Sequence, residues 1–334
     1  MPQNLLIPGR VLYVDHETIY LARGCKILRS FDGGHNWKDL VLVPCGKIGC
    51  ALFRWSLVVR LLRKGVHHLD IGESANLIIS DKETFGLDCA GLKHLGPLNG
   101  SRPMALCETG KMFYYGEYRS NPERLAVHVW KWRQGDSGWS HAWRFEEVRH
   151  VHGVFYDHYS GATWVTTGDK DSEAGIWRTD DSFVTLQKVA GGSQQLRAVQ
   201  LLFTRDHVYF GSDAPEEKNY IYRMNRSGQN IERLVAVGSS VFYGCRVGES
   251  LFFSTAIEPR TVNSTRHAEV WRSGNGLQWQ KILEFKKDLW SMKYFQYGQV
   301  FFPAGPGDGK HLYCTPFATK GHGKTIVINV ETPA

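Results

Sequence analysis

The chain has 334 residues, a net charge of +7, and 42% apolar and 13% aromatic residues. This composition excludes an intrinsically disordered chain, because so many aromatic side chains supply ample surface to bury. The basic residues are dispersed and do not interleave with stacking aromatics, so we expect no nucleic-acid partner. The longest apolar runs fall well short of the roughly 20 residues that a spanning helix needs, so we also expect no membrane span.

The cysteine content points to a reducing compartment. The seven cysteines are odd in number and none forms a C-x-x-C pair, which argues against a disulfide framework and a structural zinc site. The first ten residues lack a basic segment followed by an apolar one, so we expect no secretory signal. Together these features predict a cytoplasmic protein in which Cys107 and Cys245 serve as small core residues.

A repeat along the chain predicts the fold. Short runs of β-branched and aromatic residues alternate with turn residues, and helical periodicity is hard to find. One four-residue pattern of apolar and polar positions recurs seven times, at intervals of 42 to 52 residues. Its copies begin at Ile27, Leu77, Val129, Ile176, Ile221, Val270 and Leu312. This interval matches one propeller blade, so the sequence predicts an all-β, seven-bladed β-propeller of four-stranded antiparallel blades.

The repeat also predicts the blade boundaries within a single domain over residues 1–334. Each copy of the pattern is expected on the third strand of its blade. The expected blades cover approximately residues 5–45, 52–90, 102–146, 150–190, 197–237, 240–285 and 290–330. Residues 5–7 and 325–330 are both strand-like, and either segment is able to complete a terminal blade.

A turn motif accompanies the repeat. Ser30 to Trp37 reads S-x-D-G-G-x-x-W, with a shortened copy at 273–279 and a degenerate copy at 179–183. This motif resembles the Asp box, or BNR repeat, of sialidase-like propellers, where it lies on the turn between strands three and four. The resemblance implies that the polar residues of these turns are structural and lie away from the functional site. The three residues in question are Asp32, Asn275 and Asp180.

The resemblance extends to scaffold and substrate class only. Sialidases carry an Arg-Ile-Pro motif ahead of the first Asp box, whereas residues 9–13 here read Gly-Arg-Val-Leu-Tyr. The region 150–215 also resembles uncharacterised glycosyl hydrolase-like propellers found with bacterial surface-polysaccharide genes. No catalytic residue is transferred from either family.

Candidate site residues recur at matching positions of several blades. Loops between strands two and three share one end of a blade with the start of its inner strand, and in this chain those loops are long and polar. We expect catalytic side chains at the ends of the second strands and at one inner strand, namely Glu117, Asp169, Asp213, Glu258 and His152. We expect substrate-binding side chains near the starts of inner strands, namely Arg54, Arg102, Arg197 and His150, and count Arg246 as a further candidate arginine for an acidic substrate. Strand alternation places His150 and His152 on one side of their strand.

These residue types favour cleavage of an acidic glycan or oligosaccharide. Hydrolysis needs one carboxylic acid with a raised pKa and a second carboxylate, whereas a lyase would use His152 as the base. The alternatives are a non-catalytic propeller that binds a glycan or a protein, and a cytoplasmic sugar transferase. Each residue also has a structural interpretation, in which carboxylates cap turns and arginines pair with neighbouring acids.

We expect no cofactor and no metal. The acidic segment from Asp169 to Glu173 contains a lysine and lacks the continuation of a calcium loop. A His-x-His pair on a strand is more often a packing feature than a metal site. The sugar, its linkage and the oligomeric state stay open at this point.

Overall fold

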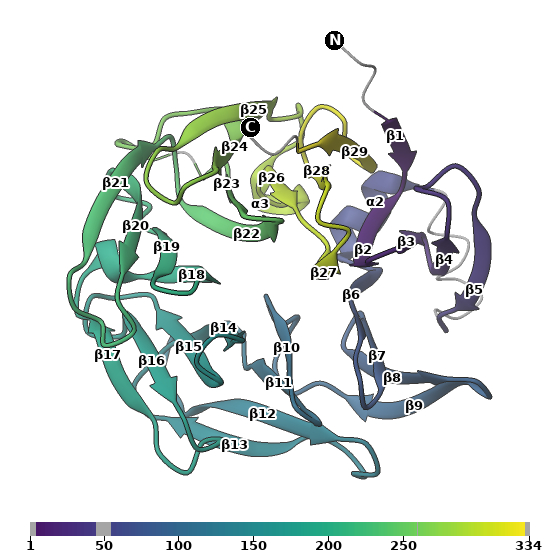
Figure 1. The fold of residues 1–334 in the computed structure, drawn as a ribbon, viewed down its shortest axis with the longest axis horizontal. Coiled ribbons are helices and arrows are strands. Elements are labelled where there is room, and N and C mark those ends of the chain that lie inside the picture. The colour runs from purple at the N-terminus through teal and green to yellow at the C-terminus, as the bar shows by residue number, and fades with distance from the viewer. Residues whose placement is uncertain (1–4, 45–54, 259, 331–334) are drawn as a thin grey trace. The chain divides into compact units, whose positions relative to one another are not determined.

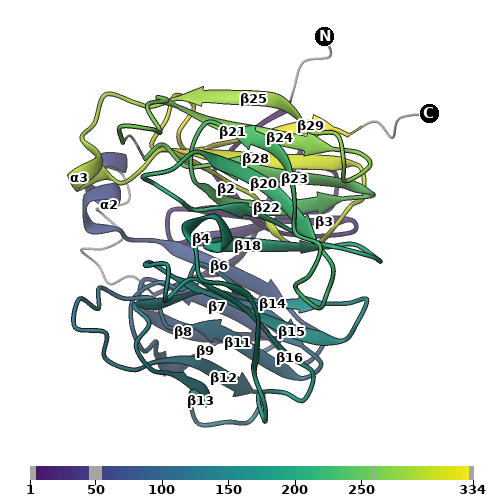
Figure 2. The same cartoon turned by 90° about the vertical axis from the view of Figure 1, so that its left-hand side faces the viewer.

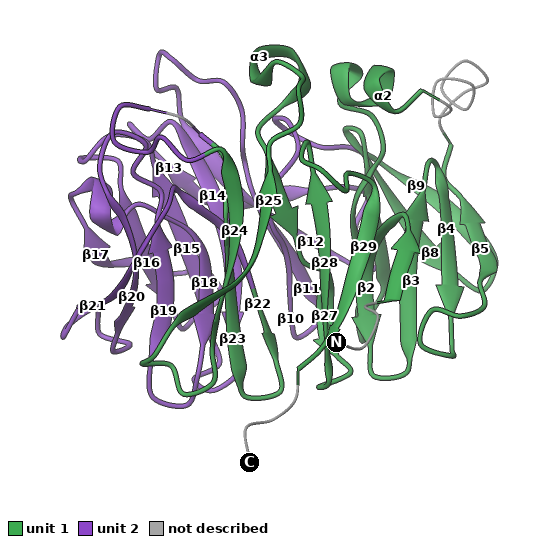
Figure 3. Ribbon diagram, turned by 90° about the horizontal axis from the view of Figure 1, so that it is seen from above, with its two compact units in different colours: residues 1–96, 245–257, 266–334 green, residues 97–244, 258–265 purple. Residues whose placement is uncertain are grey.

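The computed structural model describes residues 5–44, 55–258 and 260–330. These residues form seven sheets whose strands follow one another along the chain with few exceptions (Figure 1). The protein is an all-β, seven-bladed propeller of four-stranded antiparallel blades, which confirms the fold that the repeat predicts. Contacts divide the chain into two compact units, which Figure 3 shows in green and purple.

Unit 2 comprises residues 97–244 and 258–265 and contains three complete sheets. In each sheet, consecutive strands pair antiparallel from the first to the fourth. The first sheet holds β10 (Leu106–Thr109), β11 (Met112–Gly116), β12 (Val127–Arg133) and β13 (Ser140–Phe145). The second holds β14 (His150–Asp157), β15 (Ala162–Gly168), β16 (Gly175–Thr179) and β17 (Gln187–Gly191). The third follows the short 3₁₀ helix η1 (Gln194–Leu196) and holds β18 (Ala198–Phe203), β19 (Val208–Ser212), β20 (Asn219–Met224) and β21 (Glu232–Val237).

Unit 1 comprises residues 1–96, 245–257 and 266–334. Two of its sheets lie in the first hundred residues. They hold β2 (Arg10–Asp15), β3 (Thr18–Arg23), β4 (Lys26–Ser30) and β5 (Lys38–Leu42), then β6 (Val66–Ile71), β7 (Asn76–Ser80), β8 (Glu83–Asp88) and β9 (Gly91–Pro97). A further sheet joins β22 (Val241–Val247), which contains the boundary after residue 244, to β23 (Ser250–Thr255), β24 (His267–Ser273) and β25 (Gln280–Lys286).

The last sheet combines both ends of the chain. It holds β26 (Gln299–Phe301), β28 (His311–Phe317), β29 (Lys324–Asn329) and β1 (Leu5–Pro8). The segment β27 (Ala304–Gly307) leaves this sheet and pairs parallel with β2, so that the first sheet has five strands. The segment at 5–8 therefore completes the last blade as its fourth strand, rather than starting the blade expected over 5–45.

The repeated pattern occupies the third strand in five sheets and the second strand in two. Leu77 lies on β7 and Leu312 on β28, each the second strand of its sheet. In the last sheet, β1 supplies the fourth strand from the other end of the chain, which makes the patterned strand the second. In the sheet expected from residue 52, the helix α2 (Ser56–Leu62) comes first and the strands begin only at Val66. Buried second and third strands share the same apolar alternation, so the pattern does not separate them.

The core lies between the faces of neighbouring sheets. In unit 2, one cluster joins β10–β13 to β14–β17, and Val129 and Val151 are among its members. A second cluster joins β14–β17 to β18–β21, with Trp164 and Phe210 fully buried. Cys107 belongs to the first cluster, as expected, and Cys245 is half-buried against a cluster of unit 1.

Two short helices of unit 1, α2 and α3 (Met292–Phe295), lie side by side (Figures 1 and 2). The buried Arg60 on α2 joins them, because its guanidinium donates to the Asp288 carboxylate at 2.6 Å and to the Phe295 carbonyl at 2.7 Å. Within the described residues, no helix has the length and apolar character needed to cross a membrane.

The turn at Ser30–Trp37 and its shortened copy at 273–279 have the local role that their sequence indicates. Between β4 and β5, the Asp32 carboxylate accepts hydrogen bonds from the Ser30 hydroxyl at 2.7 Å and from the Asn36 backbone N–H at 2.9 Å. The Trp37 indole donates to the Gly34 carbonyl and packs on the neighbouring apolar cluster. The Asn275 side chain accepts backbone N–H groups in the equivalent turn between β24 and β25.

The degenerate copy is shifted by one residue from the expected position. Asp181, not Asp180, accepts the Thr179 hydroxyl at 2.8 Å and the Thr185 backbone N–H at 2.9 Å, as Asp32 does in its own turn. Asp180 instead pairs with Arg178. Two successive aspartates occur in the sequence, and the spacing from Thr179 matches the second of them.

Replacement of Asp32 by alanine is expected to lower the melting temperature by about 1–3 °C, because the turn loses its carboxylate acceptor. Thermal unfolding followed by circular dichroism measures this change. Asp39→Ala, which removes an exposed carboxylate on β5, is the matched control. An Asp32→Ala variant that keeps the wild-type melting temperature would contradict the structural role.

Candidate functional site

Three carboxylates lie at equivalent positions on three successive blades. Asp169 follows β15, Asp213 follows β19, and Glu258 comes three residues after β23. Each is therefore at the end of a second strand, where the sequence analysis expects site residues. All three belong to unit 2.

Arg197 lies at the centre of these carboxylates. It is the residue between η1 and β18, and its side chain is largely buried. Its Nη2 atom lies 2.8 Å from Asp213 Oδ2 and 3.2 Å from Asp169 Oδ1. Burial lowers the pKa of Arg197, but the negative charges of Asp213, Asp169 and Glu258 outweigh that effect and raise it. The guanidinium is therefore a fixed positive charge shared by three acids.

Glu258 differs from the other acids in its protonation. Burial raises its pKa to about 7, and the negative charge of Asp213 adds to this rise. Arg197, Arg260 and a hydrogen bond from the Ser240 hydroxyl at 3.4 Å act in the opposite direction and only partly offset it. Near neutral pH, a large fraction of Glu258 is therefore a carboxylic acid that can donate a proton.

His150 and His152 point to the same place, as strand alternation predicts. Their Nε2 atoms are 3.1 Å apart, and Asp169 Oδ1 lies 3.1 Å from the first and 3.8 Å from the second. The pairing of β14 with β15 skips a residue at His152, which marks a β-bulge that redirects this side chain. His152 Nδ1 lies 2.9 Å from the Ala198 carbonyl, so this nitrogen carries the proton.

Of the three carboxylates around Arg197, Asp169 contacts the largest number of described charged or polar side chains. Besides the contacts with the histidines and Arg197, its Oδ2 atom accepts a hydrogen bond from Arg149 Nη1 at 2.7 Å. Burial raises the pKa of Asp169, but the contacts with His150 and His152 and the charge of Arg197 outweigh it, so the pKa lies well below its usual range. For His150, burial disfavours the charged imidazolium and so lowers its pKa. The His150 imidazole is therefore neutral near pH 7.

A glycine at the end of β15 lets these side chains meet. A Cβ atom on Gly168 would lie 2.6 Å from His152 Cε1 and 3.1 Å from Arg197 Cγ. Gly116 ends β11 and Gly211 lies one residue before the end of β19, and at both positions a Cβ would collide with a valine of the next inner strand. Glycine near the end of a second strand is therefore a sequence signal for close approach of the following blade.

The Gly168→Ala variant is expected to lose about 1–3 kcal/mol of unfolding free energy, because the added methyl group must displace His152 or Arg197. Chemical denaturation measures the loss. Gly161→Ala is unsuitable as a control because its φ is positive, whereas Gly138→Ala meets open space at an ordinary φ. Equal stability of the Gly168→Ala and Gly138→Ala variants would contradict this packing.

Glu117 is engaged in a separate network. One carboxylate oxygen accepts Arg119 Nε at 2.7 Å, and the other accepts the His128 backbone N–H at 3.1 Å and lies 3.0 Å from its Nδ1. The Trp130 indole also donates to this second oxygen. Glu117 is therefore saturated by structural hydrogen bonds, unlike the three carboxylates around Arg197.

The structure does not place the other three predicted arginines in the cluster around Arg197. Arg246 donates to the Gly248 carbonyl at 2.7 Å and pairs with Glu249 at 2.6 Å, which ties it to the β22–β23 turn. Arg102 is half-buried in the loop ahead of β10, which begins at Leu106 and not near residue 102. Arg54 lies outside the described residues.

Two residues of the site were not anticipated. The Tyr118 ring lies 4.3 Å from that of His150, and burial raises the pKa of its phenol, with Asp213 and Asp169 adding to the rise. Arg149 precedes His150 and reaches Asp169, although alternation places its backbone position opposite to that of its neighbour. Tyr118 directly follows Glu117, so the sequence signal for it is its place one residue after a strand-end acid.

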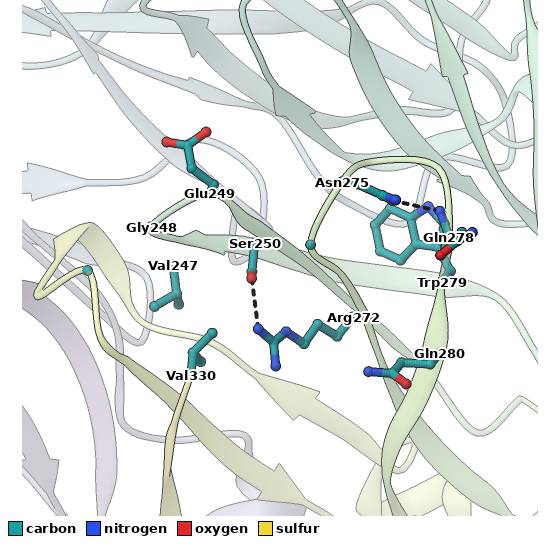
Figure 4. A pocket seen from close by; sticks show the side chains of 12 residues that line it. Val247, Gly248, Glu249, Ser250, Arg272, Asn275, Gln278, Trp279, Gln280 and Val330 are labelled. Carbon is teal, nitrogen blue, oxygen red and sulfur yellow. Dashed lines mark hydrogen bonds between the residues drawn. The ribbon is translucent and has the colours of Figure 1, made fainter. Parts of the chain in front are cut away.

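Unit 1 has a pocket of about 560 Å³ at the β22–β23 and β24–β25 turns (Figure 4). Its lining includes Asn275 and Trp279 from the turn at 273–279. Its two charged lining residues are Arg272, which donates to the Ser250 hydroxyl at 3.2 Å, and Glu249, which pairs with Arg246. This lining offers no second carboxylate for acid–base work, so we place the candidate functional site at Arg197.

Comparison with known proteins supports the fold alone. No protein-family model matches the chain, and no curated protein matches its sequence. Among solved structures, a chain of the mitotic checkpoint complex is similar over 99% of this chain and 95% of its own, with 12% identity and a TM-score of 0.60. The AfRom2 CNH domain covers 98% and 96%, with 7% identity and a TM-score of 0.56. The designed protein Ika8 covers 97% and 98%, with 12% identity and a TM-score of 0.50.

Proposed function

We propose that the protein is a carbohydrate-active enzyme that hydrolyses an acidic glycan or oligosaccharide at the cluster around Arg197. The observation that carries this proposal is the grouping of Asp169, Asp213 and Glu258 around one buried arginine. Glycoside hydrolysis requires a carboxylic acid and a carboxylate in one place, and two carboxyl groups in different environments supply both.

The roles follow from the environments. Glu258, with its pKa of about 7, is the general acid that protonates the glycosidic oxygen. Asp213, whose Oδ2 pairs with Arg197, keeps its Oδ1 buried without a hydrogen-bond partner among the described residues. That oxygen is the free acceptor that would activate water or stabilise the positive charge of the transition state.

Arg197 and Arg149 account for an acidic substrate. Arg197 Nε is buried without a hydrogen-bond partner in the described part of the chain. We propose that this guanidinium N–H donates to the carboxylate of the substrate. The Asp-box turns support the same substrate class, because they resemble those of sialidase-like propellers. The association with bacterial surface-polysaccharide metabolism is part of this proposal and rests on sequence resemblance.

Elimination fits the site less well than hydrolysis does. A lyase base must reach a C–H bond of the sugar, but the Nδ1 atom of His152 faces the Ala198 carbonyl at 2.9 Å. Its Nε2 atom faces His150 and Asp169 rather than open solvent. The more accessible Glu258 is suited to proton donation.

Cleavage of a panel of uronic-acid and sialic-acid oligosaccharides, followed by mass spectrometry, tests the proposal. Hydrolysis in heavy-oxygen water labels the product, whereas elimination gives an unsaturated and unlabelled sugar. Asp213→Asn is expected to lower kcat by at least about 100-fold without loss of folding. Binding without cleavage by the wild-type chain would instead support a non-catalytic glycan-binding propeller.

The pH profile provides a further test. Glu258 is active when protonated, so kcat is expected to fall by about tenfold per pH unit above a pKa near 7. The charged groups that act on Glu258 are Asp213, Arg197 and Arg260, and of these only Asp213 raises its pKa. In the residual activity of the Asp213→Asn variant, the fall of kcat at alkaline pH should therefore begin at a lower pH than in wild type. If kcat of that variant falls at the same pH as in wild type, Glu258 is not the general acid.

A further inference from the structure

Two histidines and one aspartate in unit 2 bring three potential metal ligands together. His150 Nε2, His152 Nε2 and Asp169 Oδ1 all lie within 4.8 Å of one another. The pairwise distances are 3.1, 3.1 and 3.8 Å. Ligands about 2.0–2.1 Å from a tetrahedral zinc ion lie roughly 3.4 Å apart, so one ion fits between the three atoms.

The protonation of His152 leaves its inner nitrogen free to bind. Its Nδ1 atom lies 2.9 Å from the carbonyl oxygen of Ala198, which can only accept a hydrogen bond. In the tautomer that this contact selects, Nδ1 carries the proton and Nε2 presents a lone pair. A metal-binding histidine is commonly oriented in this way, by donating its other N–H to a backbone carbonyl.

The aspartate is also held as a metal ligand would be. Arg149 binds Asp169 Oδ2 at 2.7 Å, which leaves Oδ1 directed toward the histidines. Arg197 is closer to Asp213 Oδ2, at 2.8 Å, than to Asp169 Oδ1, at 3.2 Å. Asp213 therefore supplies the nearer countercharge to this guanidinium, and Oδ1 is available to a second cation.

The close contact between His150 Nε2 and His152 Nε2 is compatible with a bound cation. The two Nε2 atoms lie 3.1 Å apart and that of His152 carries no proton, so either a proton on His150 Nε2 or a cation between the two nitrogens holds this contact. His150 and His152 are buried, which keeps bulk water from separating the rings. His150 Nδ1 is also buried and has no hydrogen-bond partner among the residues that the structure describes.

We propose that His150, His152 and Asp169 bind one divalent first-row transition ion, with zinc as the representative case. Imidazole nitrogen favours such ions over magnesium or calcium, which prefer oxygen ligands. Three protein ligands leave a fourth position for water or for an oxygen of a bound molecule, as in catalytic rather than structural zinc sites. This site differs from the sequence-based expectation of no metal, and its geometry stands independently of the proposed glycan hydrolysis.

Metal binding by the full chain tests the site directly. After chelator treatment, dialysis against zinc and removal of free ion, elemental analysis is expected to find about one zinc per chain. Cobalt(II) in place of zinc should give the intense visible absorption of a four-coordinate ion. Anomalous X-ray scattering at the zinc edge should place the ion between His150, His152 and Asp169. A chain that retains no zinc, or an anomalous peak elsewhere, overturns the proposal.

Matched variants separate this site from adventitious binding. His152→Gln and Asp169→Asn are expected to weaken zinc binding by more than about 100-fold, since each loses a direct ligand and even outer-shell losses cost 10–100-fold. His128→Gln is the control, because this half-buried histidine also contacts a carboxylate, that of Glu117. Equal zinc affinity in all three variants overturns the site. If the two ligand variants fail to fold, the anomalous peak in the wild-type chain decides.

The test also distinguishes this site from the proposed hydrolysis. Glu258→Gln lies outside the three ligands and is expected to bind zinc like the wild-type chain. Zinc binding with no cleavage of any glycan would retain the metal site and reject the hydrolase. Glycan cleavage by the metal-free protein would support the proposed hydrolysis. The zinc content and the anomalous peak would then accept or reject the metal site on their own.

Discussion

Glu258→Gln is expected to abolish glycan cleavage while leaving the fold intact. Glutamine keeps the size of the side chain but cannot donate a proton to a leaving oxygen, so kcat should fall by at least about 1,000-fold. Initial rates with the best oligosaccharide of the panel measure this loss. Glu123→Gln is the matched control, since Glu123 is exposed in the long loop of another blade.

The same substitution has a stability signature that an exposed glutamate would not show. The pKa of Glu258 is raised in the folded protein, so its contribution to stability is fully present below the pKa of the unfolded chain and is lost as pH rises toward 7. Above that pH, the wild-type protein holds a buried charge next to Asp213, and the glutamine variant does not. We therefore expect Glu258→Gln to be more stable than wild type by about 1–3 kcal/mol at pH 8, with a smaller difference at pH 5.

These two readouts constrain the role of Glu258 jointly. Loss of activity together with a gain in stability at alkaline pH is the behaviour of a site that sacrifices stability for function. A variant that loses both activity and folding would show that Glu258 holds the loop in place. Full activity in the variant would remove it from the chemistry.

The sequence predicted the number of blades because each blade needs the same apolar strands at the same interval. The assignment of strands within a blade was less reliable. Leu77 and Leu312 lie on second strands, because the helix at 56–62 and the exchange of β1 and β27 shift the strand order. Those rearrangements depend on pairing between distant parts of the chain, which a local pattern does not encode.

The site was predictable where blade geometry decides it. Asp169, Asp213 and Glu258 share a strand-end position, and equivalent positions on successive sheets bring them to Arg197. Glu117 shares that position as well, but its hydrogen bonds to Arg119 and His128 come from residues that no spacing rule marks. The side chain that satisfies a carboxylate depends on local rotamers rather than on the repeat.

The convergence of His150 and His152 was partly predictable. Alternation places both on one side of β14, but the 3.1 Å contact also requires the bulge at His152 and the missing side chain of Gly168. A bulge inserts one residue without a fixed sequence signature, so its position follows from the paired strand. The aspartate that completes the group comes from that same paired strand, β15.

Arg226→Ala is expected to destabilise the protein by about 3–5 kcal/mol, the largest stability effect that we predict. Asp157, at the end of β14, is fully buried and accepts two hydrogen bonds from Arg226, at 2.6 and 3.1 Å. Arg226 also donates to the carbonyls of Thr204 and Arg205, so it links the turn after β14 to the next blade. Its removal leaves a buried carboxylate without its countercharge.

Urea denaturation measures this loss, and a neighbouring ion pair provides the control. Arg223 lies three residues earlier, on β20, and pairs with the half-exposed Glu232 at 2.6 Å. Solvent screening limits such a pair, so Arg223→Ala should cost less than about 1 kcal/mol. Similar losses in the two variants would mean that the Asp157 carboxylate is satisfied without Arg226.

The pH dependence identifies the carboxylate as the cause. Burial raises the pKa of Asp157, but the hydrogen bonds from Arg226 and Ser160 outweigh it and lower the pKa overall. A lowered pKa in the folded protein contributes stability above the unfolded value near 4, and that stability is lost as the pH falls. In the Arg226→Ala variant, Asp157 loses its strongest partner, so protonation relieves the buried charge at low pH. The difference between wild type and variant should therefore be largest at pH 7 and shrink as the pH approaches 4. A difference that is constant over this range would assign the loss to the carbonyl contacts of Arg226 instead.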